Sequence, residues 1–201
     1  MVSPQKQPAA EIHMSAIDAI YRRRAVRDYE PSKISQATVR LLLDAAVHAP
    51  TARHEEPWAF AVVQDKKRLN RLSEHVKKLL AGGADPVHPH KASAAYDHFT
   101  APDFNAFYNA ATLIVICGKP MGAFVTADCW MAAQNLMLAA CASGLGTCVI
   151  GLAVTALNTP EWKKELGISA DMTAIAPIIL GVPAGDTLPV SRKPSEILIW
   201  K

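Results

Sequence analysis

The chain has 201 residues, and half of them are apolar, which is enough to build one folded domain with a sizeable core. Its 21 basic and 18 acidic residues leave a net charge of +3. This small excess suits an anionic small ligand. It argues against a nucleic-acid-binding protein, which needs a continuous basic face.

The N-terminal residues are polar and include two prolines, where a secretion signal would have an apolar core. We therefore predict a flexible leader over residues 1–14, one domain over 15–201 and a cytoplasmic location. The four cysteines have no CxxC spacing and lie among apolar residues. Buried, reduced thiols are the expected interpretation.

Two capped helices are predicted after the leader. Ser15 followed by Asp18 has the pattern of a capping box, so a helix begins there, passes through Tyr21 and carries a run of arginines at its end. Ser35 caps a second helix, which ends before Pro50. The apolar residues of this second helix share one face: Val39, Leu42, Leu43, Ala46 and Val47.

Buried strands alternate with helices in the rest of the chain. We predict strands at 58–64, 112–117, 147–152 and 174–182, helices at 66–80 and 126–143, and a short helix that begins at 158–160. The 126–143 helix is expected to turn four residues inward: Trp130, Leu136, Met137 and Ala140.

The stretch 136–154 carries no charge and has the length of a membrane span. Gly144 and Gly146 interrupt it, and the apolar pattern changes period there. We therefore predict a buried helix followed by a buried strand, and no membrane partner.

Residues 81–103 differ from the rest because they hold several prolines, two adjacent glycines and three histidines. An irregular stretch of this length inside a folded chain is typically a functional lid or an insertion. Metal is not expected, because His88, His90 and His98 match no standard ligand spacing and no cysteine or carboxylate cluster completes the set.

Two basic clusters are candidates for binding a phosphate. Arg23 and Arg27 are four residues apart and would share one face of the first helix, while Arg24 points elsewhere. Guanidinium groups suit phosphate because they donate two parallel, charge-assisted hydrogen bonds. Arg192 and Lys193 form a second pair near the C-terminus, so a phosphate could be held from both sides. A solvated basic patch at a helix C-terminus is the alternative.

Five motifs, in order and in register, resemble those of the FMN-dependent nitroreductase family. The segment from Arg23 to Tyr29 is similar to the family's Arg-Arg-Ser-x-Arg-x-Phe/Tyr, and that from Ala49 to Trp58 to its Ala-Pro-Ser-x-x-Asn-x-Gln-Pro-Trp. The other three motifs cover 144–148, 177–183 and 192–194, so the resemblance extends over nearly the whole chain. This chain departs from the motifs at Ala25, His54 and Glu56, where the family has Ser, Asn and Gln.

The resemblance implies an α+β, nitroreductase-like fold, with a central, mostly antiparallel sheet flanked by helices, in an intertwined homodimer that binds FMN. The arginines and Lys193 would hold the phosphate, the 50–56 loop would reach the flavin from the partner subunit, and Asn105 would face its pyrimidine edge. The implied cofactor-binding residues are Arg23, Arg24, Ala25, Arg27, Pro50, Thr51, Ala52, His54, Glu56, Asn105, Val149, Ile150, Gly151, Arg192 and Lys193.

The resemblance also implies a reaction. NADH or NADPH would reduce the flavin, and a small electron-poor acceptor such as a nitroaromatic, a quinone or an activated alkene would then reoxidise it. No catalytic side chain is required, because the flavin carries the chemistry. The alternatives are a flavin-processing enzyme or a reductive dehalogenase with the same fold, and a flavin-binding module without turnover.

Overall fold

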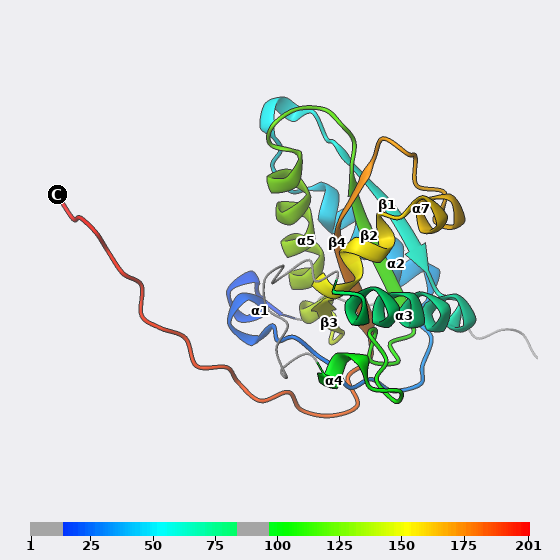
Figure 1. Ribbon diagram of the computed structural model, residues 1–201. Helices are drawn as coiled ribbons and strands as arrows, with labels where there is room; N and C mark the ends of the chain where they lie inside the picture. The colour runs from blue at the N-terminus through cyan, green and yellow to red at the C-terminus, as the bar shows by residue number, and fades with distance from the viewer. Residues whose placement is uncertain (1–13, 84–96) are drawn as a thin grey trace, which may run out of the picture.

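The computed structural model describes residues 14–83 and 97–201, and at their centre lies a four-stranded antiparallel sheet (Figure 1). The strand order is β1-β2-β4-β3, so β1 and β3 form the two edges. The predicted mostly antiparallel sheet is confirmed, since every neighbouring pair runs antiparallel. The strands are β1 (Trp58–Val63), β2 (Thr112–Gly118), β3 (Gly146–Val149) and β4 (Thr173–Gly181).

Helices cover both faces of the sheet, and the alternation of side chains along β2 shows why. Ile114 and Ile116 face the layer formed by α2 and α5, whereas Leu113 and Val115 face the layer that includes α3 and α7. All four side chains are fully buried. The helices are α1 (Ala16–Arg22), α2 (Gln36–Val47), α3 (Lys66–Ala81), α4 (Asp97–Thr100), α5 (Val125–Ala142), α6 (Val154–Leu157) and α7 (Pro160–Leu166), with short turns η1 (Ala52–His54) and η3 (Gly151–Ala153).

The predicted helix starts are confirmed at the level of single hydrogen bonds. The Ser15 hydroxyl accepts from the Asp18 N–H at 3.1 Å, and the Ser35 hydroxyl accepts from the Thr38 N–H at 3.0 Å. Gly144, at a φ of +73°, ends α5 in the left-handed conformation that glycine adopts without strain. The uncharged stretch is thus the end of α5 followed by β3, and no helix in 14–83 or 97–201 is long and apolar enough to cross a membrane.

The predicted helical face with Arg23 and Arg27 is wrong, because α1 ends at Arg22. Beyond that point the chain runs beside β3: Ala25 bridges Thr147, and the Val26 N–H donates to the Thr147 carbonyl at 3.0 Å. Glycines on the sheet make this close approach possible. A Cβ at Gly146 would lie 2.8 Å from Val26, and one at Gly181 would lie 2.6 Å from the Tyr29 ring.

Three further expectations are corrected. The third strand ends at Val149, because the chain turns into η3 and α6 there instead of continuing to Leu152. Trp130 is 41% exposed, so it lies on the outer side of α5, while Leu136, Met137 and Ala140 are buried as predicted. Val47 is also exposed, because only part of the α2 face meets the core. The leader and most of the 81–103 stretch lie outside the described residues.

The C-terminal tail leaves the body of the protein. The chain first pairs with the segment after Arg27, where the Glu30 N–H donates to the Val182 carbonyl at 2.9 Å and the Ala184 N–H to the Asp28 carbonyl at 3.1 Å. From Ala184 to Lys201 every residue is exposed. Figure 1 shows this segment, orange to red, extending away from the sheet and helices.

Candidate functional site

Three adjoining cavities follow the segment between α1 and Tyr29. The Cys148 cavity, of about 230 Å³, is lined by Arg27, Phe99, Ala106, Tyr108, Cys148, Val149, Ile150, Gly151 and Leu152. The tail cavity, of about 500 Å³, is lined by Arg24, Ala25, Arg27, Asp28 and residues 185–188 and 190. The arginine cleft, of about 700 Å³, is lined by residues that include Arg22, Arg23, Arg24, Cys141 and Thr147.

Shared side chains make these cavities neighbours, and we call the row of three the track. Arg27 lines both the Cys148 cavity and the tail cavity, and Arg24 lines both the tail cavity and the arginine cleft. One end of the track is therefore cationic. The other end is walled mainly by apolar side chains and by the backbone that leads from β3 into η3.

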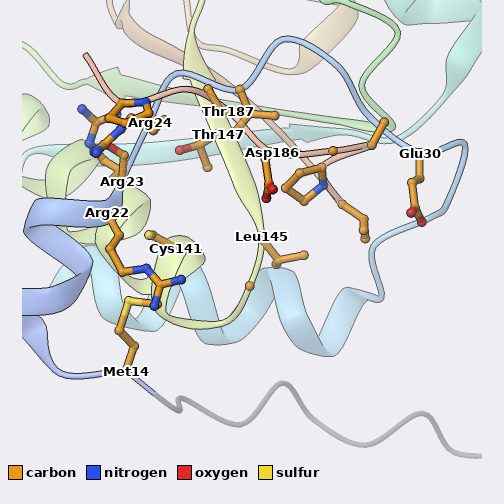
Figure 2. Close-up of a pocket in the computed structure, with 17 residues that line it drawn as sticks. Met14, Arg22, Arg23, Arg24, Glu30, Cys141, Leu145, Thr147, Asp186 and Thr187 are labelled. Carbon is orange, nitrogen blue, oxygen red and sulfur yellow. The ribbon is translucent and has the colours of Figure 1, made fainter. Parts of the chain in front are cut away.

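The three arginines of the cleft differ in whether other groups of the protein already bind their side chains. Arg24 donates from Nη1 to the carbonyls of Tyr21 at 2.6 Å and Arg23 at 2.9 Å, so its guanidinium helps to end α1. Among the described residues, no ion pair involves Arg22 or Arg23. Figure 2 shows the three arginines gathered at one end of the cleft and Glu30 at the other. This end can therefore receive an anion.

The Cys148 cavity holds a phenol, a thiol and a guanidinium. The Arg27 guanidinium carbon lies 5.8 Å from the centre of the Tyr108 ring, which is cation–π distance. Burial raises the pKa of both Tyr108 and Cys148, and the Arg27 charge opposes each shift. Cys148 is 3% exposed and its pKa is raised, so the thiol stays protonated at neutral pH, in agreement with the inert thiol expected from the sequence.

Tyr108 belongs to a tight turn whose backbone is unusual. Tyr108 and Asn109 have φ values of +50° and +56°, which non-glycine residues adopt infrequently. Asn105 holds this turn, because its side-chain oxygen accepts from the Phe107 N–H at 2.9 Å and its carbonyl accepts from the Tyr108 N–H at 2.9 Å. The Asn105 amide donates to the Asn70 side chain on α3 at 3.3 Å, and Asn105 lines none of the three cavities.

The 50–56 loop lies far from the arginine cleft in the same chain. The Ala52 N–H donates to the Asp128 carboxylate at 3.2 Å, in the first turn of α5, whereas the arginine cleft includes Cys141 near the other end of that helix. Thirteen helical residues separate the two, or about 20 Å at 1.5 Å per residue. Figure 1 shows the loop, in cyan, and α1, in blue, at opposite ends of α5.

The loop itself has a strained backbone and exposed side chains. Arg53, His54 and Glu56 have φ values of +54°, +58° and +47°. Their side chains are exposed, and Pro57 and Trp58 behind them are buried at the start of β1. Such conformations cluster at ligand-binding sites, where the surrounding structure holds them in place.

One chain thus brings together only part of the predicted set. Arg192 and Lys193 are exposed in the tail, and the loop lies at the far end of α5. The structure gathers Arg23, Arg24, Ala25, Arg27, Val149, Ile150 and Gly151 along the track, and leaves Pro50, Thr51, Ala52, His54, Glu56, Asn105, Arg192 and Lys193 away from it.

Sequence reasoning missed two side chains that position candidate site residues, Asp128 beside Ala52 and Tyr108 beside Arg27. Asp128 is the single charged residue of α5 and is 6% exposed, so a lone carboxylate in an apolar helix was a usable signal. Tyr108 had no such signal, because its position depends on a turn with positive φ. Among the described residues, no group of three or more His, Cys, Asp or Glu side chains could hold a metal ion.

Comparisons with known proteins identify the family. The family described as "Nitroreductase family" matches residues 20–182. A protein of Archaeoglobus fulgidus, named provisionally as an NADH dehydrogenase/NAD(P)H nitroreductase, is 28% identical over 169 residues, which cover 82% of this chain and 83% of that protein.

Solved structures show the same fold. A nitroreductase from Bacteroides fragilis with bound FMN superposes with a TM-score of 0.77 at 24% identity, covering 92% of this chain and 97% of that one. Iodotyrosine deiodinase bound to FMN and 3-iodo-L-tyrosine superposes with a TM-score of 0.69 at 18% identity, covering 91% and 97%.

Proposed function

The chain belongs to the nitroreductase family, and from that premise we propose that it is an FMN-dependent oxidoreductase that uses NADH or NADPH. The observation that carries the proposal is the polarity of the track. At one end lie Arg22 and Arg23, whose guanidiniums form no ion pair among the described residues, and at the other lies an apolar cavity bounded by the 149–151 backbone. FMN has the same polarity, with a phosphate at one end and a flat ring at the other. The donor set therefore fits the group.

In this proposal, some residues bind the phosphate end of FMN and others border its ring end. Arg23 binds the phosphate, with Arg22 and Arg24 adding positive charge beside it. Ala25 supplies no side-chain donor, so the guanidiniums supply the side-chain contacts in this segment. The backbone at Val149, Ile150 and Gly151 borders the ring end, and Arg27 lies between the two ends.

The protein's contribution to the reaction is binding and orientation. The bound flavin supplies hydride transfer between the pyridine nucleotide and the acceptor. The apolar wall of the Cys148 cavity excludes water from the ring, and the protonated Cys148 thiol adds no negative charge there. The acceptor that we propose is a small electron-poor molecule such as a nitroaromatic, a quinone or an activated alkene.

A homodimer completes the site in this proposal. The 50–56 loop cannot reach the arginine cleft of its own chain, because about 20 Å of α5 separates them. In a dimer, the loop of one chain meets the track of the other, and His54 and Glu56 approach the flavin. Arg192 and Lys193 reach the phosphate once the tail is ordered.

Exposed apolar residues support the dimer. They lie on α1, at the start and on the outer side of α5, and in the tail, and an interface with a second copy would cover them. The largest of them are Ile17, Ile20, Tyr21, Phe124, Trp130, Met131, Ile197, Leu198, Ile199 and Trp200. An obligate interface should be large and apolar, as these surfaces are.

The test is the visible spectrum of the purified protein, with FMN content per subunit, before and after anaerobic addition of NADH or NADPH. We expect a yellow protein with one FMN per subunit that either nucleotide bleaches and an acceptor reoxidises. A colourless protein that fails to bind added FMN contradicts the proposal. Bound FMN that neither nucleotide reduces favours the flavin-binding module without turnover. Turnover of halogenated phenols, but not of nitroaromatics or quinones, favours the dehalogenase.

A further inference from the structure

The Arg27 side chain lines both the Cys148 cavity and the tail cavity, so its guanidinium can be directed into either one. We propose that Tyr108 is a positioning residue that holds the Arg27 guanidinium at the Cys148 cavity. The consequence for a bound flavin rests on the function proposed above, but the contact between the two side chains does not.

The contact with Tyr108 favours one of two positions for the Arg27 guanidinium. Its guanidinium carbon lies 5.8 Å from the Tyr108 ring centre, and the positive charge is attracted to the negative face of the ring. The tail cavity offers a competing position, because Asp28 and the Asp186 carboxylate line it beside Arg27. Without the ring, we expect the arginine to turn toward these carboxylates.

The fold places the Tyr108 ring firmly. Phe104 and Phe107 on either side of Asn105 are buried, and Phe104 meets Tyr108 edge-to-face, with ring centres 5.7 Å apart. The Ser73 hydroxyl, 1% exposed on α3, accepts from the Ala106 N–H at 2.8 Å. The segment that leads into Tyr108 is therefore held by packing and by α3, and this support keeps the strained residue in place.

Lys77 fixes the beginning of the same segment. It is 8% exposed and donates from Nζ to the Pro102 carbonyl at 3.1 Å. Three separate contacts with α3, at Pro102, Asn105 and Ala106, thus support the turn that presents Tyr108. The ring is part of the protein's framework and does not need a ligand to order it.

Holding Arg27 in this position has a chemical effect. A reduced flavin carries more negative charge than an oxidised one, and a guanidinium near the ring end stabilises that charge more than one directed at the phosphate end. Tyr108 would thus favour binding of the reduced over the oxidised cofactor, without itself exchanging a proton or an electron.

The first experiment uses the protein without flavin. Two variants are compared with wild type: Tyr108→Phe, which keeps the aromatic face, and Tyr108→Leu, which keeps an apolar side chain of similar reach. The readout is the NMR signal of the Arg27 side-chain Nε–Hε, identified by its loss in Arg27→Lys. In wild type and Tyr108→Phe, we expect an upfield shift from the ring current. In Tyr108→Leu the signal should lose this upfield shift, because the ring is gone and the guanidinium turns toward Asp28 and Asp186. An Arg27 signal that is the same in all three proteins overturns the proposal.

The second experiment measures binding of oxidised and of reduced FMN to the same proteins. Tyr108→Leu should lower the preference for reduced FMN about three- to tenfold, the range of one cation–π contact, and Tyr108→Phe should restore it. Equal weakening of both forms together with a lower melting temperature means a merely structural role and overturns the proposal. If wild type binds no FMN, the proposed function fails, and the NMR experiment still decides whether Tyr108 holds Arg27.

Discussion

The arginine segment and the 50–56 loop are predicted to touch one ligand, yet the fold builds them differently. The arginine segment is seated on the sheet, because Val26 and Tyr29 pack over Gly146 and Gly181. The loop is tied to α5 by the Ala52–Asp128 hydrogen bond and keeps three exposed residues at positive φ. The first region is assembled within one chain, whereas the second would contribute to a site only in the dimer that we propose.

The largest expected effect is a loss of FMN affinity when the arginines of the first region are replaced. Arg23→Ala combined with Arg27→Ala removes two charged donors, each worth about 1.5–3 kcal/mol, which corresponds to a loss of roughly 10²- to 10⁴-fold in FMN affinity. Fluorescence titration with FMN measures it. The matched control is Lys66→Ala with Lys67→Ala, which removes the same charge from an exposed turn of α3. Equal affinity in the two double variants would remove the arginines from the site.

The second-largest effect is expected where the arginine segment packs against the sheet. Gly181→Ala places a Cβ 2.6 Å from the Tyr29 ring, so the segment must shift. We expect a loss of about 1–3 kcal/mol in the free energy of unfolding, together with weaker FMN binding. Thermal unfolding and FMN titration test both. Gly82→Ala at the end of α3 is the control, since its Cβ comes no closer than 3.4 Å to another atom and the residue lines none of the three cavities. An unchanged melting temperature for Gly181→Ala would show that the close contact is not needed.

The 50–56 loop should respond to Asp128→Ala. The change leaves the Ala52 N–H without its acceptor, at a cost of about 1–2 kcal/mol, and frees the loop from α5. Hydrogen exchange at the Ala52 amide should accelerate, while exchange around β3 stays as in wild type. Asp44→Ala, on the exposed side of α2, removes the same charge elsewhere and serves as control. Faster exchange in both regions would mean that the loop and the arginine segment are not independent.

The smallest expected effect is electrostatic and depends on the dimer. Glu56→Gln removes an exposed charge from the loop. The interaction energy of one such charge with the flavin ring is about 1 kcal/mol or less when water surrounds it. The flavin midpoint potential should rise slightly, because a carboxylate opposes the negative charge of the reduced form. Dye equilibration measures it. Glu55→Gln is the neighbouring control, and identical potentials for the two variants would place Glu56 away from the ring.

Local patterns in the sequence were enough to predict the strands of the sheet and most of the helices. Ser15 and Ser35 cap their helices through the bonds that their side chains predict, and the apolar runs became β1, β2 and β4. These features depend on neighbours within a few residues. The end of α1 before Arg23 does not, because pairing with Thr147, more than a hundred residues away, overrides the helix.

The site was predicted unevenly for the same reason. The arginines and the 149–151 backbone could be identified because their motifs are contiguous, and the structure places them on one track. Asn105 is predicted to face a ligand, and in the structure its side-chain oxygen supports the turn by accepting from the Phe107 N–H. Tyr108 depends on packing between that turn and α3, which no contiguous pattern in the chain encodes.

The position of α5 between the arginine segment and the loop has a consequence for symmetry. In a twofold dimer with the α5 helices antiparallel, the loop end of each helix would lie beside the arginine end of the other. Two identical sites would result, and their separation would be set by a helix of 18 residues, about 27 Å in length. The helix would then act as a ruler: inserting one residue would move and rotate one half of each site against the other, and both sites would change together.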